Sequence, residues 1–141
     1  MDVVAAAAFT WLGMVLAISF LEAPLKFRAP GVTVQLGLGI GRLVFAALNK
    51  VEIALLVVVG AALALAGARP VPVLAAAVLA GGLLVAQLAV VRPVLTRRSD
   101  EVLAGGDPSR SRAHLWYVAL EVAKVVALVV LGSAALLAQV S

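Results

Sequence analysis

The stretch GIGRLVFAALNKVEIALLVVVG, residues Gly39 to Gly60, decides the fold. Its second half is an apolar run of the kind that crosses a bilayer, which takes roughly 20 helical residues. Its first half carries polar or charged side chains close to the start of that run. They are Arg42, Asn49, Lys50 and Glu52. The sequence therefore predicts a membrane-spanning helix with a polar segment at one end.

The composition of the whole chain agrees with this interpretation. Of its 141 residues, 65% are hydrophobic and 13% are charged, and the mean hydropathy is +1.18. A chain of this composition has too few polar residues to form the surface of a water-soluble protein. Its apolar runs predict four transmembrane helices in a single domain, residues 1–141, at about 3–21, 40–68, 71–91 and 115–140, with a polar loop at about 92–114. Long uninterrupted runs favour helices over the alternating strands of a barrel, so we expect an all-α integral membrane protein forming a four-helix bundle.

Basic residues lie mainly on one side of the expected membrane. By the positive-inside rule, we expect both termini outside and the first and third loops in the cytoplasm. Arg69 is the exception. The set on the cytoplasmic side comprises Lys26, Arg28, Arg42, Lys50, Arg92, Arg97, Arg98, Arg110 and Arg112. Eight Arg against three Lys, with abundant Ala and Val, are compatible with a GC-rich bacterium, so the expected location is its inner (plasma) membrane. Within the third loop, Asp107-Pro108 predicts an N-cap and a first helical turn, so the fourth helix is expected to begin before the membrane.

Two expected helices carry polar stripes with the same spacing. Arg42, Asn49 and Glu52 fall within roughly 80° of one helix face, because each residue turns the helix by about 100°. The last helix repeats these intervals. Its stripe consists of His114, Glu121 and Lys124, with Tyr117 on the same face. Both stripes are expected at similar depths, near the cytoplasmic side.

The first and third expected helices also resemble each other. Each ends at a proline beside a charged residue, at Glu22-Ala23-Pro24 and at Arg92-Pro93. Together with the repeated stripe, this predicts that the chain is a duplicated helical hairpin.

Ionisable groups inside a bilayer cost a few kcal/mol on insertion scales, so they face protein or water and find partners. One interpretation is structural: Glu52 pairs with Lys124, Arg42 with Glu121 or Glu22, and Asn49 bridges helices. A second is a polar pocket, open to the cytoplasm, for an anion, a proton or the head of a lipophilic molecule. A third is an interface between copies of the chain. The candidates for ligand binding or proton exchange are Glu22, Arg42, Asn49, Glu52, His114, Tyr117, Glu121 and Lys124.

Several kinds of site are excluded by composition. The chain has no cysteine, which excludes thiolate chemistry, and a single histidine, His114, which excludes bis-histidine haem ligation and a His-rich metal site. No metal site and no nucleic-acid partner are expected, and no cofactor is indicated. Gly37, Gly39 and Gly41 follow no strand, so we expect them to serve helix packing or a flexible helix start rather than nucleotide binding. The expected partners are the lipid bilayer, a small or lipophilic ligand and a second copy of the chain.

Two classes of function fit these residues. The first is a protein that binds or transports a small solute, ion or lipophilic ligand. The second is an acid/base enzyme acting on a lipophilic substrate, because a carboxyl in a low-dielectric environment can hold and donate a proton. Its proton donors would be Glu22, Glu52 or Glu121, with Tyr117 or His114 completing the relay. A structural subunit of a membrane complex is a third alternative.

The segment FLEAPLKFRAPGVTVQLGLGIGRLVFAALNKVE, residues 20–52, resembles a bacterial domain-of-unknown-function family of four-helix membrane proteins that has vertebrate relatives. The shared features are an acidic residue before a proline, glycines before a phenylalanine, a polar residue at Asn49 and a histidine at the start of the last helix. The resemblance covers most of the chain and implies the four-helix fold.

Arg42, Asn49 and Glu52 also resemble residues in the second helix of the MAPEG family. These are four-helix membrane enzymes and binders that act on lipophilic substrates, often with glutathione. The resemblance implies that the three side chains help to bind glutathione. The chain departs from the family at Ala47, where a histidine is expected, and it lacks the additional arginines of that helix and a clear arginine-tyrosine pair in the fourth.

Overall fold

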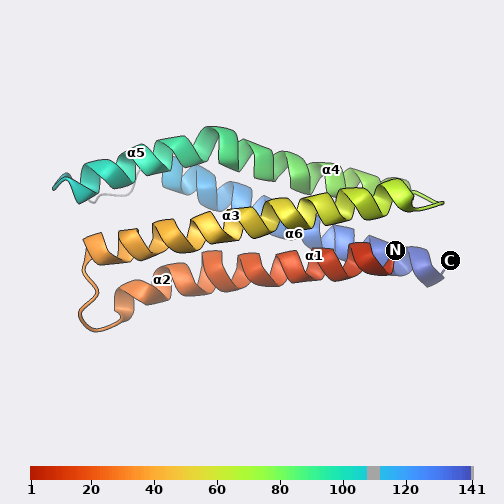
Figure 1. Ribbon diagram of the computed structural model, residues 1–141, viewed down its shortest axis with the longest axis horizontal. Helices are drawn as coiled ribbons and strands as arrows, with labels where there is room; N and C mark the ends of the chain where they lie inside the picture. Colours follow the sequence, from red (N-terminus) through yellow and green to blue (C-terminus); the bar gives the residue numbers. More distant parts are fainter. Residues whose placement is uncertain (108–111, 141) are drawn as a thin grey trace.

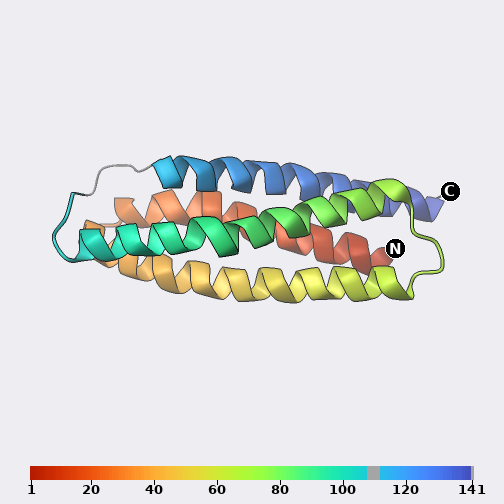
Figure 2. The same cartoon turned by 90° about the horizontal axis from the view of Figure 1, so that it is seen from above.

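The computed structural model describes residues 1–107 and 112–140, which contain helices and short connections but no strand. Four helices are long and apolar enough to cross a membrane: Asp2–Arg28, Val34–Leu65, Val71–Leu103 and His114–Gln139. They lie side by side along one axis (Figures 1 and 2). Both termini and the turn at 66–70 lie at one end, called here the terminal end, and the turn at 29–33 lies at the other, called the loop end.

The long helices are built from shorter segments. The first comprises α1 (Asp2–Val15), the π-helical η1 (Leu16–Glu22), α2 (Ala23–Leu25) and the 3-10 turn η2 (Lys26–Arg28). The second is α3 (Val34–Leu65). The third comprises α4 (Val71–Ala86), the π-helical η3 (Gln87–Val91) and α5 (Arg92–Leu103), and the fourth is α6 (Arg112–Val140).

Pro24 and Pro93 do not end their helices, which corrects the expectation from the sequence. A proline inside a helix lacks an N–H donor, and its ring clashes with the carbonyl four residues earlier. In both helices a π-helical segment comes just before the proline, which then lies in the first turn of the next α-helical segment. The wider π turn changes the local hydrogen-bond register and lets the helix continue. The expected loop at 92–114 is therefore helical as far as Leu103.

Local signals account for the other helix ends. Thr33 caps α3, accepting a hydrogen bond from the Leu36 N–H at 3.2 Å, so this helix begins six residues before the expected start at 40. Gly105 has φ +96°, a conformation suited to glycine, and ends α5. The expected start of the fourth helix at Asp107-Pro108 falls on residues 108–111, which lie outside the described part of the chain.

The bundle is packed unevenly. α1 packs against α3 and α6, and α6 also packs against α4, whereas α3 and α4 make few contacts. Small side chains permit close approach, as is common between membrane helices. A Cβ atom on Gly132 would lie 2.7 Å from the Phe9 ring, and one on Gly37 would overlap the Phe27 ring. Gly37 and Gly41 thus lie close to side chains of the first long helix, as expected for packing, whereas no neighbouring atom lies within 4 Å of a Cβ position on Gly39.

Candidate functional site

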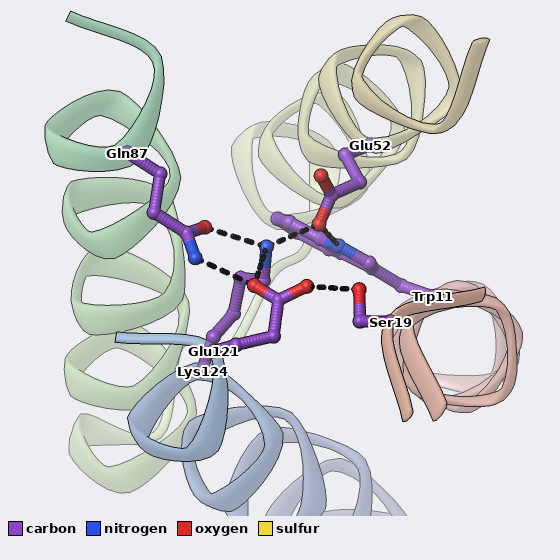
Figure 3. A network of polar contacts seen from close by, with 6 residues as sticks. All are labelled: Trp11, Ser19, Glu52, Gln87, Glu121 and Lys124. Atoms are coloured by element: carbon purple, nitrogen blue, oxygen red, sulfur yellow. Dashed lines mark hydrogen bonds and ion pairs between the residues drawn. The ribbon is translucent and has the colours of Figure 1, made fainter. Parts of the chain in front are cut away.

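Six side chains form a connected polar cluster inside the bundle (Figure 3). We call it the buried network, and its members are Trp11, Ser19, Glu52, Gln87, Glu121 and Lys124. Every one of the four long helices contributes at least one member. The network therefore connects the whole bundle through polar contacts, in a region where the surrounding core is apolar.

Lys124 lies at the centre of the buried network. Its Nζ is 2.5 Å from Glu52 Oε1, 2.9 Å from Glu121 Oε2 and 2.7 Å from Gln87 Oε1. These three contacts match the three N–H donors of an ammonium group. The residue is 0% exposed, so its charge relies entirely on these partners. The expected Glu52–Lys124 ion pair is thus confirmed.

The two carboxylates receive further hydrogen bonds. Trp11 Nε1 donates to Glu52 Oε1 at 2.8 Å, and Ser19 Oγ donates to Glu121 Oε1 at 2.6 Å. Gln87 Nε2 donates to Glu121 Oε2 at 2.5 Å. Both carboxylates are 1% exposed. Each charged group is thus paired and hydrogen-bonded, which lowers the cost of burying it.

The two π-helical segments supply network members. Ser19 lies in η1 and Gln87 is the first residue of η3. A π turn holds more residues than an α turn, so it changes which side chains face inward and often occurs at functional sites. Here the irregular backbone that accommodates Pro24 and Pro93 also brings a hydroxyl and an amide to the Glu121 carboxylate.

A cavity of about 520 Å³ lies beside the buried network, between the helices at the loop end. Its apolar wall includes aromatic rings and leucines, among them Phe20, Phe27, Phe45, Leu38 and Leu95. Its polar wall includes Lys26, Arg42, Arg92, His114 and Tyr117. Glu121 lines the cavity as well and is a member of the network, so one carboxyl group connects the two features.

Arg42 pairs with Asp100, its Nη1 lying 2.6 Å from Asp100 Oδ1. This corrects the expected pairing of Arg42 with Glu121 or Glu22. Glu22 instead pairs with Lys26 on its own helix at 3.3 Å. The prediction was wrong because residues 92–114 were expected to form a loop, whereas α5 continues as a helix and carries Asp100 to the side of α3.

Asn49 bridges two helices, as expected, and its partner is Arg92. The Asn49 amide lies against the Arg92 guanidinium, which carries only donors, so we assign the amide oxygen to this side. In that orientation Asn49 accepts hydrogen bonds from Arg92 Nε at 2.7 Å and Nη2 at 2.6 Å. This contact lies next to the cavity, which Arg92 lines. Lys50 is exposed, in keeping with a surface anchor.

The eight candidate residues thus occupy different places. Arg42, His114, Tyr117 and Glu121 line the cavity. Glu52 and Lys124 are inside the buried network, and Asn49 and Glu22 pair with neighbouring cations.

Four residues of the buried network or of its neighbouring contacts were missing from the candidates: Trp11, Ser19, Gln87 and Arg92. Gln87 was detectable, because it is the single polar side chain between Val71 and Val91. The role of Trp11 had no such signal, since a tryptophan in an apolar helix is an ordinary core residue.

Neither a metal site nor similarity to known proteins assigns a function to this chain. Among the described residues, no group of three or more His, Asp or Glu side chains is placed to hold a metal ion. No protein-family model matches the chain, and neither a curated protein nor a solved structure matches it.

Proposed function

We propose that the chain is a membrane-embedded binding or transport protein that accepts an anionic amphiphile in the loop-end cavity. The observation that carries this proposal is the mixed wall of the cavity. Aromatic and aliphatic side chains suit an apolar tail, and Lys26 and Arg92 suit an anionic head. The volume of about 520 Å³ falls in the range typical of small-molecule sites.

Two further observations support a ligand in this cavity. Ser99 lines it, and the Ser99 Oγ atom is buried without a hydrogen-bond partner in the described part of the chain. Buried hydroxyls usually have a partner, and a bound head group would supply one. In addition, Lys26 Nζ lies 5.6 Å from the ring centroids of both Phe27 and Phe45, so a cation and two apolar faces meet at one place.

The positive-inside pattern suggests where the cavity opens. The loop end carries most of the basic side chains, so the proposed orientation places both termini outside and the cavity towards the cytoplasm of a bacterial inner membrane. The duplicated hairpin remains a prediction, supported by a π-helical segment before a proline in both the first and third long helices. The two family resemblances also remain predictions.

Ligand binding can be tested with two detergent-like probes that differ in the charge of their head groups. Purified protein in a nonionic detergent would be titrated with dodecyl phosphate and with dodecyltrimethylammonium, and binding followed by native mass spectrometry. Because the wall is rich in cations, we expect saturable one-to-one binding of the phosphate and weaker binding of the ammonium probe.

A pair of variants distinguishes the cavity from the general apolar surface. Leu38 lines the cavity, whereas the Leu36 side chain is exposed and does not. Leu38→Trp is expected to abolish binding of dodecyl phosphate, and Leu36→Trp to leave it unchanged. Equal binding by both variants would show that the probe associates elsewhere and would refute the proposed site.

A second candidate function is an acid/base enzyme, because Glu121, Tyr117 and His114 share the cavity wall. All three side chains can transfer protons in catalysis. The test is to incubate the protein with lipid extracts and to follow the products by mass spectrometry. Turnover lost in Glu121→Gln but kept in Glu22→Gln would favour the enzyme over the binding protein.

A further inference from the structure

The buried network contains two carboxyl groups and one ammonium group. With all three ionised, it would carry one net negative charge. The three groups are 0% to 1% exposed, so water does not stabilise that charge. An unbalanced charge in such an environment costs several kcal/mol, whereas a neutral network avoids this cost.

Lys124 is the one cation within 4.0 Å of either carboxylate among the described residues. Arg92 also faces this region and keeps its charge, because the Asn49 amide that it binds is neutral, but it lies at the cavity wall and forms no ion pair with Glu52 or Glu121 among the described residues. Lys26 is paired with Glu22, and Arg42 with Asp100. Two further titratable groups on α6 face this side of the network: Tyr117, and His114, which lines the same cavity as Glu121. The α4 segment has no titratable side chain.

We propose that the buried network is a proton-binding site that holds one exchangeable proton on its two carboxyl groups. With this proton bound, one carboxylic acid, one carboxylate and one ammonium give a neutral network. The proposal goes beyond ligand binding, because it concerns the ligand-free chain and does not depend on what the cavity accepts.

The geometry also gives the proton a route. Glu121 lines the cavity, and Ser19, which donates to Glu121 Oε1, lines it as well. Glu52 lies on the other side of Lys124, where Trp11 covers it. A proton from the cavity therefore reaches Glu121 first. The Glu121 carboxylate gains the proton and becomes a carboxylic acid, and the reverse step returns the proton to the cavity.

The proton can be detected by infrared spectroscopy of the full chain in detergent at neutral pH. Protonated carboxylic acids have a carbonyl band well separated from the bands of carboxylates. The spectra are recorded in dodecyl maltoside, which has no carbonyl group, rather than in ester lipids, whose carbonyl band would overlap. We expect the carboxylic acid band in the wild type and its complete loss in both Glu52→Gln and Glu121→Gln. Each variant leaves one carboxylate beside one ammonium, and that pair is neutral without a bound proton.

Glu22→Gln is the matched control, because Glu22 is a partly exposed carboxylate paired with Lys26 outside the network. It should leave the band unchanged. The absence of a band in the wild type, or a band that survives in both network variants, would overturn the proposal. So would loss of the band in Glu22→Gln, because the proton would then lie elsewhere.

The route is tested by transfer to D₂O, which shifts the carbonyl band as the proton exchanges for deuterium. We expect the shift to be slower in Leu38→Trp, which fills the cavity, than in Leu36→Trp. Equal rates would refute exchange through the cavity. Failure of dodecyl phosphate to bind would leave the infrared result unaffected, so the two proposals can fail separately.

Discussion

At the scale of single residues, the two tryptophans provide a direct comparison. Trp11 is 0% exposed and donates to Glu52, whereas Trp116 is 66% exposed. Trp11→Phe removes the Nε1 donor and leaves a buried carboxylate with one hydrogen bond fewer. We expect a loss of about 1–3 kcal/mol in the free energy of unfolding. Thermal unfolding in mild detergent, followed by circular dichroism, would measure it.

Trp116→Phe is the control for this change and should alter stability by less than about 0.5 kcal/mol, as exposed substitutions usually do. Similar losses in both variants would mean that the Trp11 indole contributes through its size alone. The hydrogen bond to Glu52 would then contribute little to the stability of the bundle.

The sequence predicted the buried charges better than it predicted their partners. Glu52 and Lys124 were paired correctly because each is followed by an apolar helical stretch of similar length. Equal lengths place the two residues at the same depth in the bundle. Arg42 lies near a helix end, where depth is weakly defined, and its partner Asp100 depends on how far α5 continues. Contacts at the helix ends thus require the structure, and so do the network partners Trp11, Ser19 and Gln87, whereas the pairing of Glu52 with Lys124 follows from counting residues.

At the scale of helices, the fold class and the number of long helices follow from hydropathy, but their lengths do not. Proline was expected to end two helices, and both continue through a π-helical segment. A single sequence contains no signal that distinguishes a proline that ends a helix from one accommodated by a π turn. This difference affects the site, because the π segments place Ser19 and Gln87 against Glu121.

The contact between α1 and α6 is tested by adding one methyl group. A Cβ atom on Gly132 would lie 2.7 Å from the Phe9 ring, so Gly132→Ala forces the ring away from α6. Because Phe9 is 40% exposed and its ring can turn outward, we expect a loss near the lower end of the range of about 1–3 kcal/mol that overpacked contacts cost. The midpoint of thermal unfolding in mild detergent provides the measurement.

Gly60→Ala, in the C-terminal part of α3, is a suitable control, since no neighbouring atom lies within 4 Å of the Cβ position. Both substitutions improve helix propensity by a similar amount, up to about 1 kcal/mol, so their difference isolates the contact with Phe9. If both variants were equally stable, the close approach of α1 and α6 would be incorrect.

At the scale of the whole molecule, the polar features lie towards one end of an otherwise apolar bundle. The cavity is at the loop end, the buried network lies beside it, and the core at the terminal end is formed by small and aliphatic side chains. This asymmetry fits a site reached from one side of the membrane. If the two proposals hold, the orientation of the chain decides which compartment exchanges ligands and protons with the cavity.

Orientation can be measured with single cysteines, because the chain has none of its own. Ala29 is exposed in the turn at the loop end, and Ala68 is exposed in the turn at the terminal end. The basic residues predict a cytoplasmic loop end. In intact bacterial cells, a membrane-impermeant maleimide should therefore label Ala68→Cys, and it should label Ala29→Cys only after the membrane is permeabilised. The opposite pattern would place the cavity outside and make external solutes its source of ligands. Labelling of both variants in intact cells would show that the chain inserts in two orientations, in which case the cavity would serve both compartments.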